Sequence, residues 1–203
     1  TVRYVLDHGG HDVVVAMGGD GTFREVAAAL LDSARRTEVA LAMLPTGTAN
    51  DQGRSFGLSS DPDELEHNVR VALARRETAL DGGRLTSRDA SGNALFTGYF
   101  FDSAGWGISA RVLARRNMDR RIVERVPIVR ELWRDHALYA TAALATFLES
   151  YVVSDKFAVR ASVDGKPLTL SRLSDLIVKN TRVYAGAWVL DRTSRHDDSY
   201  FEA

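Results

Sequence analysis

The sequence predicts an α/β segment followed by a mainly β segment. A Val-rich run at residues 12–17, an Ala- and Leu-rich stretch at residues 23–33 and a second apolar run at residues 39–45 follow one another. Strand, helix and strand at this spacing form a βαβ unit with parallel strands and a right-handed crossover. The pattern changes near Thr78, so we predict two domains, residues 1–77 and residues 78–203.

A second helix is expected after the sequence SSDPDELE. Ser60 or Asp61 can cap it, Pro62 suits its first position, and the acids that follow favour the helix dipole. This helix closes the α/β segment near Arg76. Its apolar stripe consists of Leu65, Val69, Ala72 and Leu73.

The second domain is predicted to be mainly β. Its β-like runs are ETALDGGRLTSR, NALFTGYFFDSAG, KFAVRASVDGKPLTLS and SDLIVKNTRVYAG, and VDGKP is a hairpin signal. Two helical stretches interrupt these runs, from Ile108 to about Arg116 and from about Val129 to Glu149.

Composition narrows the class of protein. The 203 residues are 45% hydrophobic and 26% charged, with a net charge of −1, so global charge does not favour nucleic acid as a partner. The absence of cysteine excludes disulfides and thiolate metal sites and fits the cytoplasm. The longest apolar segment, ALYATAALATFLESYVV, contains Glu149 and Ser150 and is expected to be a buried helix rather than a membrane span. No signal peptide is recognisable, and without an initiator Met the chain is expected to begin partway through a domain.

The first candidate site is the strand exit MGGDGTFRE. Gly18, Gly19 and Gly21 allow backbone amides to approach a phosphate, and Thr22 adds a hydroxyl. Asp20 would repel a phosphate unless Mg²⁺ lies between them, so it favours phosphoryl transfer over passive binding. Glu25, one turn further on, can face the same ligand or the solvent.

The second candidate site is the segment PTGTANDQGRSFGL, which follows the second predicted strand. Ligands of open α/β sheets collect outside the carboxyl ends of the strands, so this segment should lie near the first loop. We expect Thr46, Gly47, Thr48 and Asn50 to bind a nucleotide, while Asp51 is better explained as a helix cap.

Together these loops resemble the catalytic domain of the diacylglycerol kinase, sphingosine kinase and bacterial lipid kinase family. The likeness rests on GGDGTFREV and PTGTANDQGRSFGL and continues through LDGGRL, FFDSAGWGISARV, VDGKPLTL and IVKNTRVYAGAWVLDRTSRHDDSYFE. It implies a Rossmann-like domain, similar to that of NAD kinase, and a β-sandwich domain with ATP in the cleft between them. It also implies ATP ligands at residues 19–25 and Thr48. From its charge beside the phosphates, we expect Asp20 to be the catalytic residue, in direct or water-mediated contact with the metal.

The resemblance further implies a Mg²⁺ site held by the carbonyls of Arg195 and Tyr200 and the carboxylate of Asp198. Ser199 stands where the family commonly has glycine, and serine is tolerated there where φ is negative. Gln52 and Gly53 replace an aromatic and small pair. The opening Asn-Pro strand and a closing glutamate, proposed as general base, lie outside this sequence.

A basic segment offers a second kind of contact. The segment from Arg111 to Arg134 contains eight arginines and three acidic residues, with apolar residues between them. The segment is either a solvated helix face or a surface that docks on an anionic bilayer at the inner face of the membrane.

The sequence therefore predicts an ATP- and Mg²⁺-dependent lipid kinase of phospholipid metabolism, which transfers a phosphoryl group to a diacylglycerol-like or sphingoid hydroxyl. Two alternatives stay open: an enzyme similar to NAD kinase, and a regulatory nucleotide-binding domain without turnover.

Overall fold

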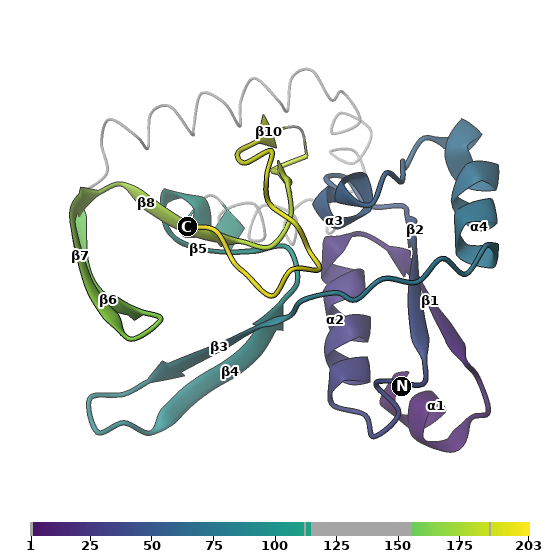
Figure 1. Ribbon diagram of the computed structural model, residues 1–203, viewed down its shortest axis with the longest axis horizontal. Helices are drawn as coiled ribbons and strands as arrows, with labels where there is room; N and C mark the ends of the chain where they lie inside the picture. Colours follow the sequence, from purple (N-terminus) through teal and green to yellow (C-terminus); the bar gives the residue numbers. More distant parts are fainter. Residues whose placement is uncertain (1, 112, 115–155, 187) are drawn as a thin grey trace, which may run out of the picture. The chain divides into compact units, whose positions relative to one another are not determined.

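A computed structural model describes residues 2–111, 113–114, 156–186 and 188–203 (Figure 1). These residues form two compact units, one of residues up to 103 together with 179–202, and one of residues 104–178. The first unit thus combines both ends of the chain. The predicted boundary at residue 78 marks a change of sequence pattern, and the assignment of domains stays a prediction.

Two parallel strands form the centre of the α/β part. β1 (Val13–Gly18) pairs with β2 (Ala40–Pro45) in a register that places Gly18 opposite Pro45. Both strands and their parallel direction were predicted from the apolar runs. Because parallel strands end at one edge, the segments that follow Gly18 and Pro45 leave the sheet side by side.

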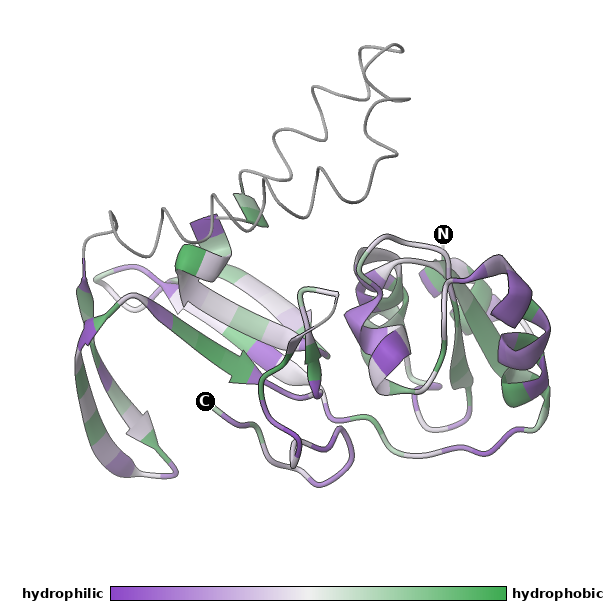
Figure 2. Cartoon of the chain, turned by 90° about the horizontal axis from the view of Figure 1, so that it is seen from above, coloured by the Kyte–Doolittle hydropathy of each residue, from purple (hydrophilic) through white to green (hydrophobic). Residues whose placement is uncertain are grey.

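The helix α2 (Asp20–Leu31) begins three residues earlier than predicted. Gly19 adopts an extended conformation as N-cap, so Asp20 already occupies the first helical position, where its negative charge suits the helix dipole. The predicted loop thus shrinks to a single junction residue. The core formed by α2 and the two strands contains Ala16, Phe23, Val26, Ala27 and Met43, and Figure 2 shows the apolar colouring of these strands.

A shorter helix, α1 (Val2–His8), precedes β1. Its one buried side chain, Leu6, packs with Leu30 and Val39 in a second small core. The guanidinium of Arg35 donates hydrogen bonds to the carbonyls of Leu6, Gly9 and His11, which fixes the turn between α1 and β1.

The second predicted helix is present, but its packing differs from the prediction. It consists of a short 3₁₀ turn (Pro62–Glu64) and α4 (Leu65–Leu73), and the Asp61 carboxylate accepts the amide of Asp63 as predicted for a cap. The apolar stripe is largely exposed, with Leu73 at 75%. The buried residue is Asn68, because its side chain bonds both backbone groups of Ser59.

Two antiparallel strand pairs and a short helix also belong to the first unit. The antiparallel pair β3 (Gly83–Arg88) and β4 (Ala94–Phe100) follows the α/β segment. The short strands β9 (Val183–Tyr184) and β10 (Trp188–Val189) pair antiparallel, and the helix α3 (Asp51–Ser55) follows the second loop.

The described residues of the second unit lie mostly in β-strands. β6 (Phe157–Val163) and β7 (Lys166–Leu173) form the hairpin expected from VDGKP, with positive φ at Asp164 and Gly165. β5 (Ser103–Gly107) pairs with β8 (Asp175–Lys179), and residues 108–111 are helical as expected.

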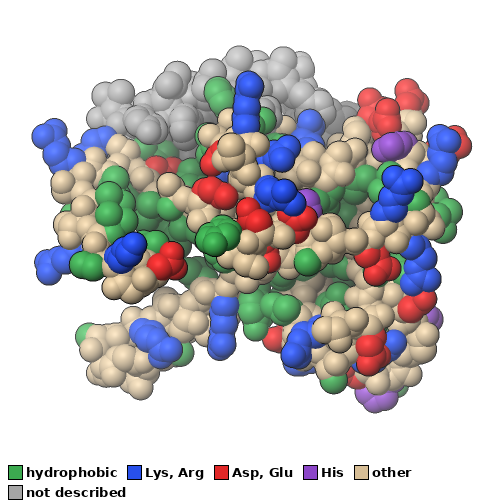
Figure 3. Space-filling model, viewed as in Figure 1, with side chains coloured by type: hydrophobic (Ala, Val, Ile, Leu, Met, Phe, Trp, Pro, Cys, Tyr) green, Lys and Arg blue, Asp and Glu red, His purple; other side chains and the backbone are tan. Residues whose placement is uncertain are grey.

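Two predictions fall outside the described residues. They concern the helix from about Val129 to Glu149 and most of the basic segment between Arg111 and Arg134. In the ranges that the structure describes, no helix combines the length and apolar character that crossing a bilayer requires. Acidic and basic side chains are interspersed over the face shown in Figure 3.

Candidate functional site: two glycine loops at one sheet edge

The two predicted loops meet through their glycines. The amide of Thr46 donates to the carbonyl of Gly18 over 2.9 Å, which joins the loops where the strands end. A methyl group placed on Gly47 would lie 2.5 Å from the Cα of Gly19, closer than a real Cβ can approach. Glycine at position 47 is therefore required for this backbone contact, and the two loops form one surface.

The amino terminus of α2 has free backbone donors. The amide of Phe23 is the first to bond within the helix, to the Gly19 carbonyl, and among the described residues no side chain caps this end. The preceding amides are thus available to an anion, which the helix dipole also favours. Apart from its chain neighbours and the backbone of its own helix, a Cβ added to Gly21 would have no atom within 4 Å, so this residue borders open space.

The remaining residues of the first loop divide into two groups. Gly18 has a packing role, because an added Cβ would lie 2.5 Å from the hydroxyl oxygen of Thr22. Thr22 and Glu25 are both exposed on α2, so neither is committed to the core. Their predicted contacts with a nucleotide stay predictions.

Asn50 organises the second loop from within. Its side-chain oxygen accepts the amide of Gly47 at 3.0 Å, and its side-chain nitrogen donates to the Gly47 carbonyl at 2.7 Å. The residue is 1% exposed and has a φ of 52°, a conformation that asparagine tolerates better than most residues. Asn50 thus shapes the loop, while Thr46 and Thr48 are exposed.

Asp20 joins the first loop to α3. Its Oδ1 accepts the amide of Gln52 at 2.9 Å, so one carboxylate oxygen satisfies a free donor at the start of α3. Sequence reasoning did not predict this bond, because it spans 32 positions.

Asp51 acts differently from the helix cap that its position predicts. Asn50 is the N-cap of α3, and the Asp51 carboxylate instead accepts the amide of Gly186. Asp51 is 7% exposed, and this burial raises the pKa of its carboxyl group despite the hydrogen bonds from Gly186 and Ala185. The left-handed conformations of Ala185 and Gly186 turn the backbone around this carboxylate.

A segment far along the chain completes the surroundings of Asp51. We call residues 179–186 the strap. Asn180 is fully buried, and its side-chain nitrogen donates to the carbonyls of Asp81 and Phe101 at 2.8 and 2.9 Å. The amide of Val183 donates to the Ser55 hydroxyl at 3.2 Å. The strap therefore joins α3 to the segments beside β3 and β4.

Two charged groups at the strap, Lys179 within it and Asp102 bound to it, were not predicted from the sequence. Asp102 accepts a hydrogen bond from the Thr181 hydroxyl, and burial, followed by the nearby Asp51, raises the pKa of the Asp102 carboxyl to about 6. Lys179 is 4% exposed, and burial lowers the pKa of its ammonium group. The residue pattern of the strand that ends at Lys179 does not indicate that this lysine is buried.

The predicted metal loop is a tight turn. Asp198 accepts the amide of Tyr200 at 3.1 Å, and Asp81 accepts the amide of Ser199 at 2.6 Å. The φ of Ser199 is 65°, whereas serine was expected to be tolerated at this position with a negative φ. In the described ranges, no group of three or more His, Cys, Asp or Glu side chains can hold a metal ion. The Arg195 guanidinium is paired with Asp197 at 3.1 Å.

The chain is similar in sequence and fold to known proteins. The family model of the diacylglycerol kinase catalytic domain matches residues 2–85, which include both glycine loops. The matched part is thus similar to the diacylglycerol kinase catalytic domain over less than half of the chain. The resemblance predicted from the two loops is thereby confirmed.

Named relatives agree with this family. A probable lipid kinase YegS-like of Klebsiella pneumoniae is 36% identical over 88 residues, covering 43% of this chain and 28% of that protein. One of Cronobacter sakazakii is 41% identical over 83 residues, covering 40% and 27%. The aligned part thus accounts for less than a third of either relative.

A solved structure extends the likeness of fold beyond the diacylglycerol kinase catalytic region. The crystal structure of a diacylglycerol kinase from Bacillus anthracis matches with a TM-score of 0.60 at 17% identity, covering 98% of this chain and 56% of that chain. At this identity the match concerns the fold alone. It confirms a mixed α/β and β-rich architecture, while the Rossmann-like and β-sandwich assignments stay predictions.

Proposed function

We propose that this chain carries the nucleotide site of an ATP-dependent lipid kinase. The observation that carries the proposal is the meeting of Gly19 and Gly47 at the carboxyl ends of two parallel strands, beside the uncapped start of α2. Backbone donors, a helix dipole and two glycines at one edge are what a chain of phosphates needs. The match of residues 2–85 to the model of the diacylglycerol kinase catalytic domain supports the same function.

In this proposal the amides of residues 20–22 bind phosphate oxygens. The hydroxyls of Thr22, Thr46 and Thr48 are exposed and can add donors, and Gly21 leaves the space that a phosphate would fill. Glu25 lies one turn along the exposed side of α2, where it can meet the sugar of the nucleotide or the solvent. Asn50 contributes by holding Gly47 in place.

Asp20 is proposed as the catalytic residue. One of its oxygens is engaged by the Gln52 amide, which fixes the carboxylate beside the amino terminus of α2. In this proposal its second oxygen is an acceptor suited to Mg²⁺ or to the water around it. Mg²⁺ bound with ATP would supply neutralisation of the charge that develops on the transferred phosphoryl group.

The reaction joins the hydroxyl oxygen of the lipid to the γ-phosphorus as the bond to the β,γ-bridging oxygen breaks. ADP leaves, and the hydroxyl proton is released. Because such transfer depends on positioning and charge, a rigid loop pair is the main contribution expected of this chain.

A structural Mg²⁺ is proposed at the loop 195–200. Oxygen donors suit this ion, and the proposed set consists of the Asp198 carboxylate with the carbonyls of Arg195 and Tyr200. The hydrogen bond from the Tyr200 amide orients Asp198, and Asp81 reaches the same loop through Ser199. The donor chemistry therefore fits, and the bond from Ser199 to Asp81 already joins this loop to the segment before β3.

The lipid acceptor rests on the named relatives, which are probable lipid kinases. An enzyme of this kind would work at the cytoplasmic face of a membrane, and the basic segment between Arg111 and Arg134 is the proposed peripheral contact.

The deciding experiment uses the full-length gene product that contains this chain. Purified protein is incubated with Mg-ATP and, separately, with diacylglycerol, sphingosine, ceramide, phosphatidylglycerol or NAD. We expect ATP-dependent phosphorylation of one of the lipids. Phosphorylation of NAD alone would favour the NAD kinase alternative, and ATP binding with no transfer to any acceptor would favour a regulatory domain.

A further inference from the structure

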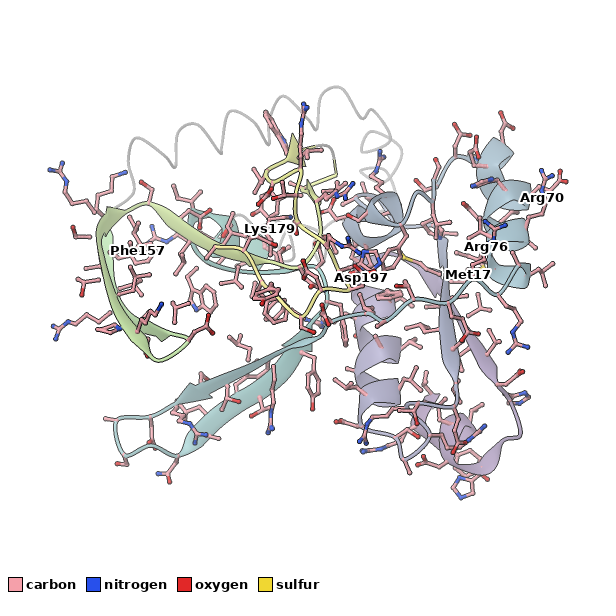
Figure 4. All side chains as sticks on the ribbon, in the orientation of Figure 1. Met17, Arg70, Arg76, Phe157, Lys179 and Asp197 are labelled. Atoms are coloured by element: carbon pink, nitrogen blue, oxygen red, sulfur yellow. The ribbon has the colours of Figure 1, made fainter. Side chains whose placement is uncertain are left out.

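Lys179 is a buried cation among acids that the proposed reaction does not use. The side chain, labelled in Figure 4, is 4% exposed, yet its ammonium group donates a hydrogen bond to the Val183 carbonyl at 2.9 Å. It also lies 5.2 Å from the centre of the Tyr184 ring, a distance at which a cation and an aromatic face attract each other. Burying a lysine costs free energy, so these surroundings call for an explanation.

Acidic groups surround this ammonium. Asp102, Asp51, Glu202 and Asp191, in decreasing order of effect, favour the charged form of Lys179 against its burial. Asp102 and Asp51 are bound by other residues of the strap, through the hydroxyl of Thr181 and the amide of Gly186. Glu202 pairs with the backbone of Lys179 and accepts the hydroxyl of Ser194 at 2.8 Å.

Three of the carboxylates in this region lie near one another and near the glycine loops. Asp20, which opens α2, accepts the amide of Gln52, the residue that follows Asp51. Asp102 accepts the amide of Asn180 at its carbonyl and the Thr181 hydroxyl at its carboxylate, directly after Lys179 in the strap. The charge of Asp20 also helps to raise the pKa of both Asp51 and Asp102. Three negative charges close to the helix start would oppose binding of a phosphate chain there, because unit charges a few ångströms apart interact strongly in a partly buried region. A buried cation in the same region reduces this opposition.

We propose that Lys179 offsets the negative charges of Asp51 and Asp102 beside the two glycine loops, so that an anionic phosphate chain can bind at the start of α2. Lys179 is thus a positioning residue that acts through these carboxylates. The inference rests on the proposed function, because the anion in question is the phosphate chain of ATP.

The test is a double-mutant cycle in the full chain with Lys179→Met and Asp102→Asn. Lys179→Met removes the charge and keeps the length of the side chain, and Asp102→Asn keeps an acceptor for the Thr181 hydroxyl. Urea unfolding of the four proteins measures the coupling without ligand, and calorimetry measures their affinity for Mg-ATP. Lys166→Met, at an exposed position of β7, is the matched control.

We expect Lys179→Met to lower the urea midpoint and to weaken Mg-ATP binding by about tenfold, the size of a nearby unit charge at a partly screened site. The double variant should regain most of both losses, and the control should change neither. A purely structural lysine would lower the urea midpoint but leave the affinity of the folded protein unchanged.

Additive losses in the urea cycle would overturn the inference, as would an unchanged affinity in a folded Lys179→Met protein. If Lys179→Met alone does not fold, folding of the double variant supports the inference and failure of both overturns it. Coupling in the urea cycle without any binding of Mg-ATP by the wild type would overturn the proposed function and leave the charge offset standing.

Discussion

The glycine loops and the strap differ in how they contribute to one site. The loops present open backbone, with Gly21 beside empty space and exposed hydroxyls at Thr46 and Thr48. The strap begins with three buried polar residues, because Lys179, Asn180 and Thr181 are each at most 4% exposed. The groups proposed to bind the ligand thus come from neighbouring loops. The residues that hold these loops in place come from a segment more than 100 positions further along the chain.

The loops are most sharply tested by Asp20→Asn, for which we expect the largest effect. Asparagine keeps an oxygen for the Gln52 amide, so the tie to α3 survives while the charge is lost. Loss of a positioned electrostatic contact in a transition state costs about 10² to 10³ in rate. Lipid phosphorylation kinetics should therefore show kcat falling by this factor with little change in ATP affinity. A kcat within about threefold of the wild type would remove Asp20 from the catalytic role.

The strap is tested by Asn180→Ala. The change leaves the carbonyls of Asp81 and Phe101 without their buried donor, which costs about 2 to 4 kcal/mol for two unsatisfied groups. Urea unfolding should show this loss, whereas Asn93→Ala, at an exposed turn between β3 and β4, should cost much less. An equal loss of stability in the two variants would mean that the buried hydrogen bonds of Asn180 do not stabilise the fold.

Asp102 sharpens the comparison through pH. Its carboxyl has a pKa raised from 3.8 to about 6, so the folded state binds the proton more tightly than the unfolded state. The resulting stabilisation is complete below pH 3.8 and is lost as the pH rises through about 6. The shift corresponds to at most about 3 kcal/mol. Asp102→Asn should therefore raise stability at pH 8 more than at pH 4, and a gain independent of pH would contradict the burial of this charge.

The smallest effect is expected at the loop 195–200. Asp198→Ala should weaken Mg²⁺ binding by at least about tenfold, since it removes the charged member of the proposed set. Asp191→Ala is the control, because Asp191 is engaged by the amide and hydroxyl of Thr193. Calorimetric titration that gives wild-type affinity for Asp198→Ala would exclude Asp198 as a ligand.

Local pattern predicted the loops well because their cause is local. The apolar runs set β1 and β2, and parallel pairing then brings Gly18 and Pro45 to one edge. The start of α2 was placed too late because glycines usually signal a loop, whereas the extended Gly19 here lets the helix begin at Asp20. The exposed stripe of α4 shows the limit of periodicity, which indicates an apolar face but not whether anything covers it.

The strap was beyond sequence reasoning for a different reason. Asp51 looks like a helix cap because Asn-Asp at a helix start is usually one, and only the fold brings Gly186 to its carboxylate. The burial of Lys179 and the raised pKa of Asp102 likewise arise from contacts between distant segments. Ser199 with a φ of 65° shows that a residue identity does not fix its backbone angle.

The central claim, that the start of α2 binds the phosphates, is tested most directly by thermal unfolding with and without Mg-ATP. The wild type should gain stability, by about 2.7 kcal/mol at one hundred times the dissociation constant. Gly21→Val should fold without ligand, because nothing lies within 4 Å of the added Cβ, and should show no stabilisation by Mg-ATP because the side chain fills the ligand's space. A Gly21→Val protein that is stabilised as much as the wild type would contradict the claim.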